Sequence, residues 1–297
     1  MSGIGQASNR PVVVNIMIDA ELSPSARNLT PQEEAFVELS SLVEMLENID
    51  SKGIKTTVYF TGDFASKQIG NVSYKDYVIR VASKPNHEIA LHGMTSADML
   101  GHMSYKQQHS LLTRAKALIE AAYLEDNKSV TIKGFRPQYF NQSEDTYKVL
   151  DEIGMVYDSG YQAGFLYGPS HENDTWPYLV ENHTFYAVPV STYSVAGKLV
   201  HTCDLCSKQV VGLNGTQWSD LLVRKFQECA DRGDPMVVLF HNFVSAEDSE
   251  YLTAFRKFVD FAASENATFV TTMDLVEMAK RNRPMTGISP VQGLERE

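Results

Sequence analysis

The strongest constraint on the fold of this 297-residue chain is a repeated alternation of short apolar runs with amphipathic stretches. The run PVVVNIMID at 11–19 is rich in Val and Ile, as expected of a buried strand. The stretch at 32–49 that follows carries Leu39, Val43 and Leu46 at helical spacing. Similar pairs continue along the chain, which predicts parallel strands wrapped by helices.

The alternation predicts strands and helices of ordinary length over most of the chain. We expect strands at 11–19, 55–61, 87–91, 131–136, 185–189, 235–241 and 268–271. We expect helices at 32–49, 74–83, 104–124, 143–153, 216–229, 249–264 and 273–281. A closed or nearly closed sheet fits this repeat better than a flat one. The predicted fold is therefore α/β, a distorted (β/α) barrel with about seven parallel strands.

The domain limits follow from the same pattern. We expect one barrel domain over 11–282, preceded by a polar, Gly- and Ser-containing leader at 1–10. The tail at 283–297 contains Pro and Gly and is expected to be extended. The segment 160–216 has the least regular pattern and is predicted to form long loops or an insertion over one rim of the barrel.

Composition excludes several classes of protein. The formal net charge is −11 and no Lys/Arg cluster occurs, so we expect no nucleic-acid partner. No apolar stretch of about 18 residues occurs, so we expect no transmembrane segment. Residues 1–10 lack the apolar core of a signal peptide, which suits a cytoplasmic protein or one whose signal has been removed.

Asparagines in glycosylation triplets indicate where the protein works. Eight of the fourteen asparagines lie in Asn-x-Ser/Thr, whereas chance would place about two there. The excess predicts a secreted or cell-surface glycoprotein, with a cytoplasmic location as the alternative. The eight are Asn28, Asn71, Asn127, Asn141, Asn173, Asn182, Asn214 and Asn266.

The chain has three cysteines, and two of them form the motif Cys203-Asp-Leu-Cys206. One Cys-x-x-Cys pair does not complete a tetrahedral zinc site. The motif lies in the irregular segment rather than at a predicted strand-to-helix turn, where a redox-active pair would be expected. We therefore expect a disulfide between two of the three cysteines, Cys203, Cys206 and Cys229, with the remaining one free.

Polar residues suited to catalysis occur where predicted strands end. Asp19 and Glu21 close the first strand, His92 follows the third, Arg136 ends the fourth and His241 ends the sixth. In a (β/α) barrel the carboxyl ends of the strands meet at one face, where the chemistry takes place. The order of these residues therefore predicts one active site.

The motifs around these residues resemble those of the polysaccharide deacetylases, also called the NodB-homology family or carbohydrate esterase family four. Met17-Ile18-Asp19-Ala20-Glu21 is similar to the first family motif in a variant with the two acids separated by one residue. The strand TVYFTG at 57–62 and the segment HEIALHG at 87–93 are similar to the two segments that follow in the family.

The later motifs extend the resemblance over about 11–281. Gly134-Phe135-Arg136-Pro137-Gln138-Tyr139 resembles the third motif, 156–159 the fourth, and Leu239-Phe240-His241 the fifth. The resemblance implies that Asp19 is the general base, that Arg136 orients it and that His241 is the general acid. It further implies that backbone near Tyr139 helps hold the oxyanion and that Tyr139 and Asp158 bind substrate.

The metal-binding half of the family pattern is incomplete. The resemblance implies a divalent metal, Zn²⁺ first among the candidates, with Glu21 and His92 as ligands. The family places a further histidine four residues after His92, and here that position is Ser96. A catalytic zinc ion takes three protein ligands, so we expect weak or absent metal binding unless His102 reaches the site.

Three functions are consistent with the sequence. The leading one is hydrolysis of carbon–nitrogen bonds, specifically N-deacetylation of an acetylated amino sugar in a polysaccharide. The second is a metal-independent amidase of the same fold acting on a small amide. The third is an inactive glycan-binding surface protein. The retained acid and base favour an enzyme, because a binding module has no need of them.

Overall fold

The computed structural model describes residues 11–23, 28–124 and 130–282, so the predicted leader and tail lie outside the described residues. Nine strands form one curled sheet in the order β12-β1-β2-β5-β6-β7-β9-β8, with β13 beside β1. They are β1 (Val13–Ala20), β2 (Thr56–Phe60), β5 (His87–Leu91), β6 (Gly134–Phe135), β7 (Tyr157–Gln162), β8 (Tyr178–Leu179), β9 (Tyr186–Val190), β12 (Met236–His241) and β13 (Thr268–Phe269).

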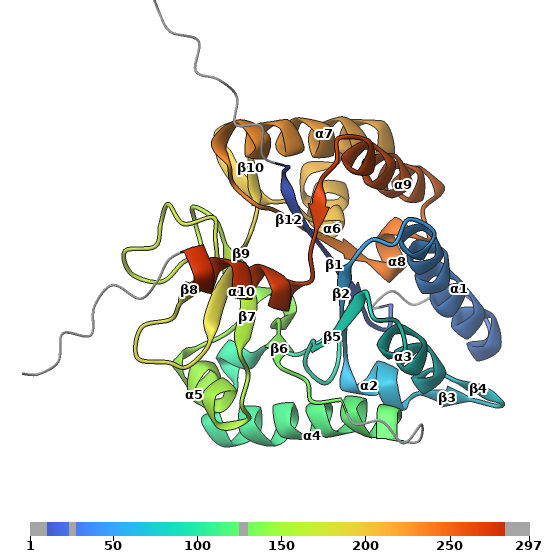
Figure 1. Cartoon of the computed structure of the whole chain (residues 1–297). Helices are drawn as coiled ribbons and strands as arrows, with labels where there is room; N and C mark the ends of the chain where they lie inside the picture. Colours follow the sequence, from blue (N-terminus) through green and yellow to red (C-terminus); the bar gives the residue numbers. More distant parts are fainter. Residues whose placement is uncertain (1–10, 24–27, 125–129, 283–297) are drawn as a thin grey trace, which may run out of the picture.

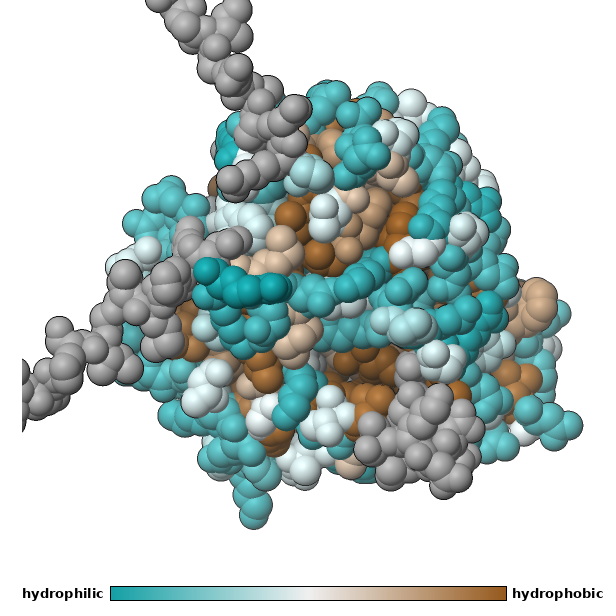
Figure 2. Space-filling model, viewed as in Figure 1, coloured by the Kyte–Doolittle hydropathy of each residue, from teal (hydrophilic) through white to brown (hydrophobic). Residues whose placement is uncertain are grey.

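Helices surround the strands, as Figure 1 shows for α1, α4, α5, α7 and α9. The helices are α1 (Pro31–Asp50), α2 (Gly62–Ser66), α3 (Lys75–Ala82), α4 (Tyr105–Leu124), α5 (Glu144–Glu152), α6 (Asp204–Cys206), α7 (Gly215–Arg232), α8 (Asn242–Ser245), α9 (Ser249–Ser264) and α10 (Thr272–Asn282). In the same view, Figure 2 shows hydrophilic residues over much of these outer helices. No helix in the described ranges is both long and apolar enough to span a membrane.

The predicted barrel is confirmed as a mixed α/β half-barrel with a curled and mostly parallel sheet. Strands β12, β1, β2, β5, β6, β7 and β9 pair in parallel in that order, while β8 pairs with β9 antiparallel. At the open side, the backbone N–H of Ser191, just after β9, donates to the carbonyl of Val237 in β12 at 3.0 Å. This bond draws the two sides of the curled sheet together.

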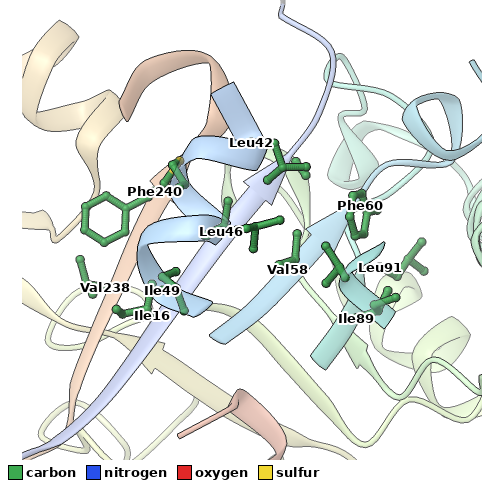
Figure 3. Packing of buried hydrophobic residues seen from close by; sticks show 14 of the residues in the cluster. Ile16, Leu42, Leu46, Ile49, Val58, Phe60, Ile89, Leu91, Val238 and Phe240 are labelled. Atoms are coloured by element: carbon green, nitrogen blue, oxygen red, sulfur yellow. The ribbon is translucent and has the colours of Figure 1, made fainter. Parts of the chain in front are cut away.

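Alternation along the strands separates two cores. On β1, Ile16 and Ile18 face outward and belong to the larger core, whereas Met17 faces into the barrel and belongs to a second, smaller one. Figure 3 shows the larger core, where Leu42 and Leu46 of α1 pack against the outer face of the sheet. The same alternation decides which polar side chains reach the barrel interior.

Helix α10 covers the end of the barrel where the parallel strands begin. Its Leu275 and Val276 belong to the inner core. The backbone N–H groups at its start donate to side chains near the beginnings of β2 and β5, from Thr272 to Thr57 and from Met273 to Glu88. The strand beginnings are thus closed by packing, and the carboxyl ends are the face left for a site.

Two local signals mark the ends of α5, which lies within the helix predicted at 143–153. Ser143 is its N-cap and forms a capping box with Thr146. Gly154, two residues beyond the helix, has φ = 73°, a left-handed conformation that suits glycine after a helix end. The predicted strand at 131–136 is shorter than expected, Gly134–Phe135, and β7 was not predicted because its sequence YDSGYQ lacks an apolar run.

The rim segment 160–216 is more ordered than its pattern indicated. Strands β10 (Thr192–Val195) and β11 (Lys198–His201) form an antiparallel hairpin. Cys203 then pairs in parallel with Leu239 of β12 and is the N-cap of α6. The Cys-x-x-Cys motif therefore does lie at a strand-to-helix turn, contrary to the prediction. The predicted disulfide is also wrong, because all three cysteines are free.

Candidate active site

A cavity of about 390 Å³ opens where the parallel strands end. Its floor contains most of the predicted site residues, and its walls come largely from the rim segment and the loop after β6. The predicted site residues that line it are Asp19, Glu21, His92, Ser96, Arg136, Tyr139 and His241. A larger cavity of about 670 Å³ beside α7 contains none of the predicted site residues.

Asp19 and Arg136 form a buried ion pair at the centre of the floor, each with about 1% of its surface exposed. Arg136 Nε donates to Asp19 Oδ1 at 3.1 Å, and Nη2 donates to the same oxygen. The guanidinium also stacks on the ring of Tyr59, 3.9 Å from its centroid. Burial raises the pKa of Asp19, but Arg136 and the nearby His92 together lower it by more. The net pKa therefore lies well below its ordinary value.

Because Arg136 binds only Oδ1, the second oxygen of Asp19 faces the remaining polar groups. Asp19 Oδ2 lies 3.2 Å from His92 Nε2 and 3.7 Å from His241 Nε2. An ionised carboxylate with one oxygen anchored and the other directed at the cavity has the arrangement that a general base requires.

The orientation of His92 is fixed by the backbone. Its Nδ1 lies 2.9 Å from the carbonyl oxygen of Arg136, and a carbonyl only accepts, so Nδ1 carries a proton. Nε2 therefore points toward the acids, 3.2 Å from Asp19 and 4.0 Å from Glu21. Nε2 is thus the ring atom that faces both carboxyl groups of the floor.

Glu21 is held at the edge of the floor by neutral groups. Gln138 Nε2 donates to Glu21 Oε2 at 2.7 Å and to the backbone carbonyl of His92 at 3.2 Å. The backbone N–H of Glu21 donates to Asn242 Oδ1 at 3.2 Å. Burial raises the pKa of Glu21 above its ordinary value, more than His92 lowers it.

His241 has a partner that the sequence reasoning missed. Its Nδ1 lies 2.6 Å from Asp204 Oδ1, and its backbone N–H donates to Asp204 Oδ2 at 2.8 Å. Ser245 Oγ and the backbone N–H of Leu205 complete the bonds to this fully buried carboxylate. Burial lowers the pKa of His241, but Asp204 raises it more, to about 9.

The predicted metal ligands do not form a compact three-ligand set. Among the described residues, groups of three or more His, Cys, Asp or Glu with ligand atoms within 4.8 Å of one another occur at two places, and neither contains Glu21 or His92. Ser96 lines the cavity at the third position, and Glu21 Oε2 is already bound by Gln138. His102 is exposed on the short 3-10 turn Leu100–His102 and does not line the cavity. These residues do not fit a catalytic zinc site with three protein ligands.

The two predicted substrate-binding residues differ in position. Tyr139 is 59% exposed at the cavity mouth, where its hydroxyl donates to the backbone carbonyl of Ser96 at 2.9 Å. Asp158 is fully buried and lies outside the cavity. On β7, Ser159 faces inward toward Arg136, so the preceding Asp158 points to the opposite side of the sheet. The prediction that Asp158 contacts substrate therefore has no support from its position.

Residues 40–157 match the family model of the polysaccharide deacetylases. This segment is less than half of the chain and includes His92 and Arg136 but not Asp19, Glu21 or His241. A comparison with curated proteins finds no significant match. The segment 40–157 is therefore similar to the polysaccharide deacetylases, and the match does not extend to the rest of the chain.

Several solved structures share the fold over nearly their whole length. A Mycobacterium smegmatis protein assigned to the polysaccharide deacetylases is 19% identical, with a TM-score of 0.69 over 95% of this chain and 96% of that one. Puue allantoinase is 16% identical, with a TM-score of 0.70 over 95% and 98%. A Pseudomonas aeruginosa PAO1 protein, also assigned to the deacetylases, is 15% identical with the same score and coverage. At these identities the likeness shows the fold.

Proposed function

We propose that this chain hydrolyses amide carbon–nitrogen bonds in the cavity at the carboxyl ends of its strands. The observation that carries the proposal is the opposed pair of Asp19 and His241, whose facing atoms lie 3.7 Å apart. Each is held by a buried partner of opposite charge, Arg136 for the acid and Asp204 for the histidine. A protein that only bound a ligand would have no need for two such supported groups.

In the proposed reaction, Asp19 and His241 carry out the two proton transfers of amide hydrolysis. Asp19 Oδ2, ionised at neutral pH, takes a proton from water as the water attacks the carbonyl carbon. The C–N bond then breaks as protonated His241 gives its proton to the leaving nitrogen. Because its pKa is lowered, Asp19 is a weak base at equilibrium. The proton that it takes from the water therefore stays on Asp19 only briefly and then passes to the products.

Backbone strain beside the floor supports a place for the oxyanion. Tyr139 and Phe140, which line the cavity, have φ = 53° and φ = 55°, values unusual for residues with side chains. Such strain costs about 1–3 kcal/mol per residue and concentrates at functional sites. We assign the backbone N–H groups of this turn to the developing oxyanion, as the family resemblance implies.

Glu21 is a second candidate for the base. Its raised pKa lies nearer to neutral pH than that of Asp19, and a base works best when its pKa is close to the working pH. Single substitutions separate the two roles. If Asp19 is the base, Asp19→Asn lowers kcat by at least about 100-fold while Glu21→Gln retains measurable turnover. The reverse order would assign the base to Glu21.

For the substrate, we propose the N-acetyl group of an amino sugar. Tyr139 at the mouth and Phe165, which is 45% exposed, are placed for a sugar ring to stack on them. The rim also carries apolar side chains, among them Leu199 and Val210. The fold shared with Puue allantoinase supports, as a second candidate, a small cyclic amide.

Two assays separate these substrates. We expect acetate release from N-acetylglucosamine oligomers, and no opening of the allantoin ring, if the first candidate is correct. Ring opening without acetate release would support the second. Both should be lost in Asp19→Asn. Binding of the oligomers without turnover of either compound would contradict the proposed hydrolase and support a glycan-binding protein.

We also propose, from the glycosylation triplets, that the protein is secreted or displayed on the cell surface. The asparagine positions Asn28, Asn71, Asn173, Asn182, Asn214 and Asn266 are exposed, which supports this location. Asn141 is half-buried and its Oδ1 accepts from Gly101, so we expect it to be unmodified. A mobility shift after endoglycosidase treatment tests the proposal, and its absence in protein from a glycosylating host would refute it.

A further inference from the structure

A second group of metal-ligating side chains lies on the wall of the active-site cavity. The ligand atoms of His201, Cys203 and Cys206 all lie within 4.8 Å of one another, and all three residues line the cavity. Cys203 is 1% exposed, whereas His201 and Cys206 are partly exposed. The proposed acid–base reaction uses none of these side chains.

We propose that His201, Cys203 and Cys206 bind a thiophilic divalent metal ion such as Zn²⁺, with the fourth coordination position open to the cavity. Two thiolates and one imidazole are a known ligand set for zinc sites that keep an exchangeable position. Soft sulfur ligands favour Zn²⁺ over Mg²⁺ or Ca²⁺. Glu21 and His92 take no part in this site.

The backbone holds the three ligands in place without a metal. His201 ends β11, which is paired to β10 with Thr192 opposite it. Cys203 pairs with Leu239 of β12, and its carbonyl accepts the backbone N–H of Ser207 at 3.0 Å across the following turn. Cys206 lies within that turn, which brings its Sγ to within 4.8 Å of Cys203 Sγ. A preformed set of this kind loses little conformational freedom when it binds a metal.

Neighbouring groups support the chemistry of the site. Cys206 Sγ lies within 4.8 Å of both Cys203 Sγ and a ring nitrogen of His201, so the three ligand atoms face one another. The ring of Phe140 packs edge-on against His201, with centroids 4.8 Å apart, and limits the rotation of the imidazole. The Cys203 thiol donates to Asp204 Oδ1 at 3.8 Å, which orients this side chain before a metal binds.

Cobalt substitution tests the proposal directly. The full chain, reduced with a non-thiol phosphine and freed of metal with a chelator, is titrated with Co²⁺. We expect one equivalent to bind with a thiolate-to-cobalt charge-transfer band and the visible bands of tetrahedral Co²⁺. Zn²⁺ should displace it stoichiometrically. Cys206→Ser and His201→Ala should each weaken binding at least about tenfold, and Cys206→Ser should remove most of the charge-transfer intensity.

Two matched controls fix the location of the ion. Cys229→Ser changes a cysteine that is buried outside the cavity and should leave the band unchanged. Glu21→Gln should also leave it unchanged, because that residue belongs to the other candidate ligand set. A band lost in Glu21→Gln but kept in Cys206→Ser would overturn the proposal.

Two further results would also contradict the site. Reduced wild-type protein that gives no charge-transfer band does not bind metal through its cysteines. A band of equal intensity in Cys206→Ser would place the thiolate elsewhere. Because the cobalt spectrum is measured without substrate, it tests metal binding independently of amide hydrolysis. An inactive protein with the expected cobalt spectrum would refute only the proposed function.

Discussion

Replacing Asp204 with asparagine tests the link between a buried carboxylate and the proposed catalytic acid. Asp204 faces the ring of His241 at 2.6 Å and is the main cause that raises the pKa of that histidine to about 9. Asparagine has nearly the same shape but no charge. It therefore removes the ionic stabilisation of the imidazolium while its side-chain oxygen still accepts from Nδ1.

The structure gives the size of the effect. Without the carboxylate, we expect the pKa of His241 to fall to about its ordinary value of 6.5, because burial lowers it while the charges of Asp19 and Glu21 still raise it. At pH 8 the protonated fraction then drops from about 0.9 to about 0.03, so kcat/KM should fall about thirty-fold. At pH 6 both proteins are mostly protonated, and the loss should be less than about twofold.

Two measurements and one control separate this electrostatic role from a structural one. An NMR titration of the His241 ring proton gives the pKa directly, and the pH profile of kcat/KM gives its effect on turnover. Ser245→Ala removes one hydrogen bond to Asp204 but keeps its charge, so the alkaline limb should stay near pH 9. An equal loss for Asp204→Asn at pH 6 and pH 8 would refute the reasoning.

Three other substitutions test separate parts of the structure. Arg136→Met leaves Asp19 buried without its partner and should lower the free energy of unfolding at pH 7 by about 3–5 kcal/mol in urea denaturation, whereas a loss below 1 kcal/mol would contradict the buried pair. Gly134→Ala would place a Cβ 2.0 Å from the Tyr157 ring and should destabilise the fold by about 1–3 kcal/mol in the same assay. Ser96→His should raise the affinity for Co²⁺ through a non-thiolate site, and an unchanged titration would contradict the placement of that loop.

The sequence predicted the residues of the cavity floor because strand ends are easy to locate. Apolar runs ending at Asp19 and His241 fixed the ends of β1 and β12, which pair in register with these two residues opposite each other. Parallel strands then bring their carboxyl ends to one face. The pattern also predicted the positions of His92 and Arg136, since both follow neighbouring strands of the same sheet.

The parts that escaped prediction depend on contacts distant in sequence. Asp204 looked like one residue of an irregular Cys-x-x-Cys segment, and its role follows from its packing against a residue 37 positions later. The bridge from Cys203 to Leu239 that positions it has no local sequence signal. The direction of the Asp158 side chain could not be predicted for a local reason. The sequence of β7 lacks an apolar run, so nothing in it showed which residues face the barrel interior.

The buried charges at the centre of the cavity floor are balanced in two pairs. Asp19 is balanced by Arg136, and Asp204 is balanced by protonated His241, so each catalytic group has its own counter-charge without a metal ion. Glu21 is left without a cationic partner in hydrogen-bond contact; it is held by a neutral amide, and burial raises its pKa. The proposed acid–base pair therefore has its charges balanced by protein side chains, and its charge balance does not require a cation held by Glu21 and His92.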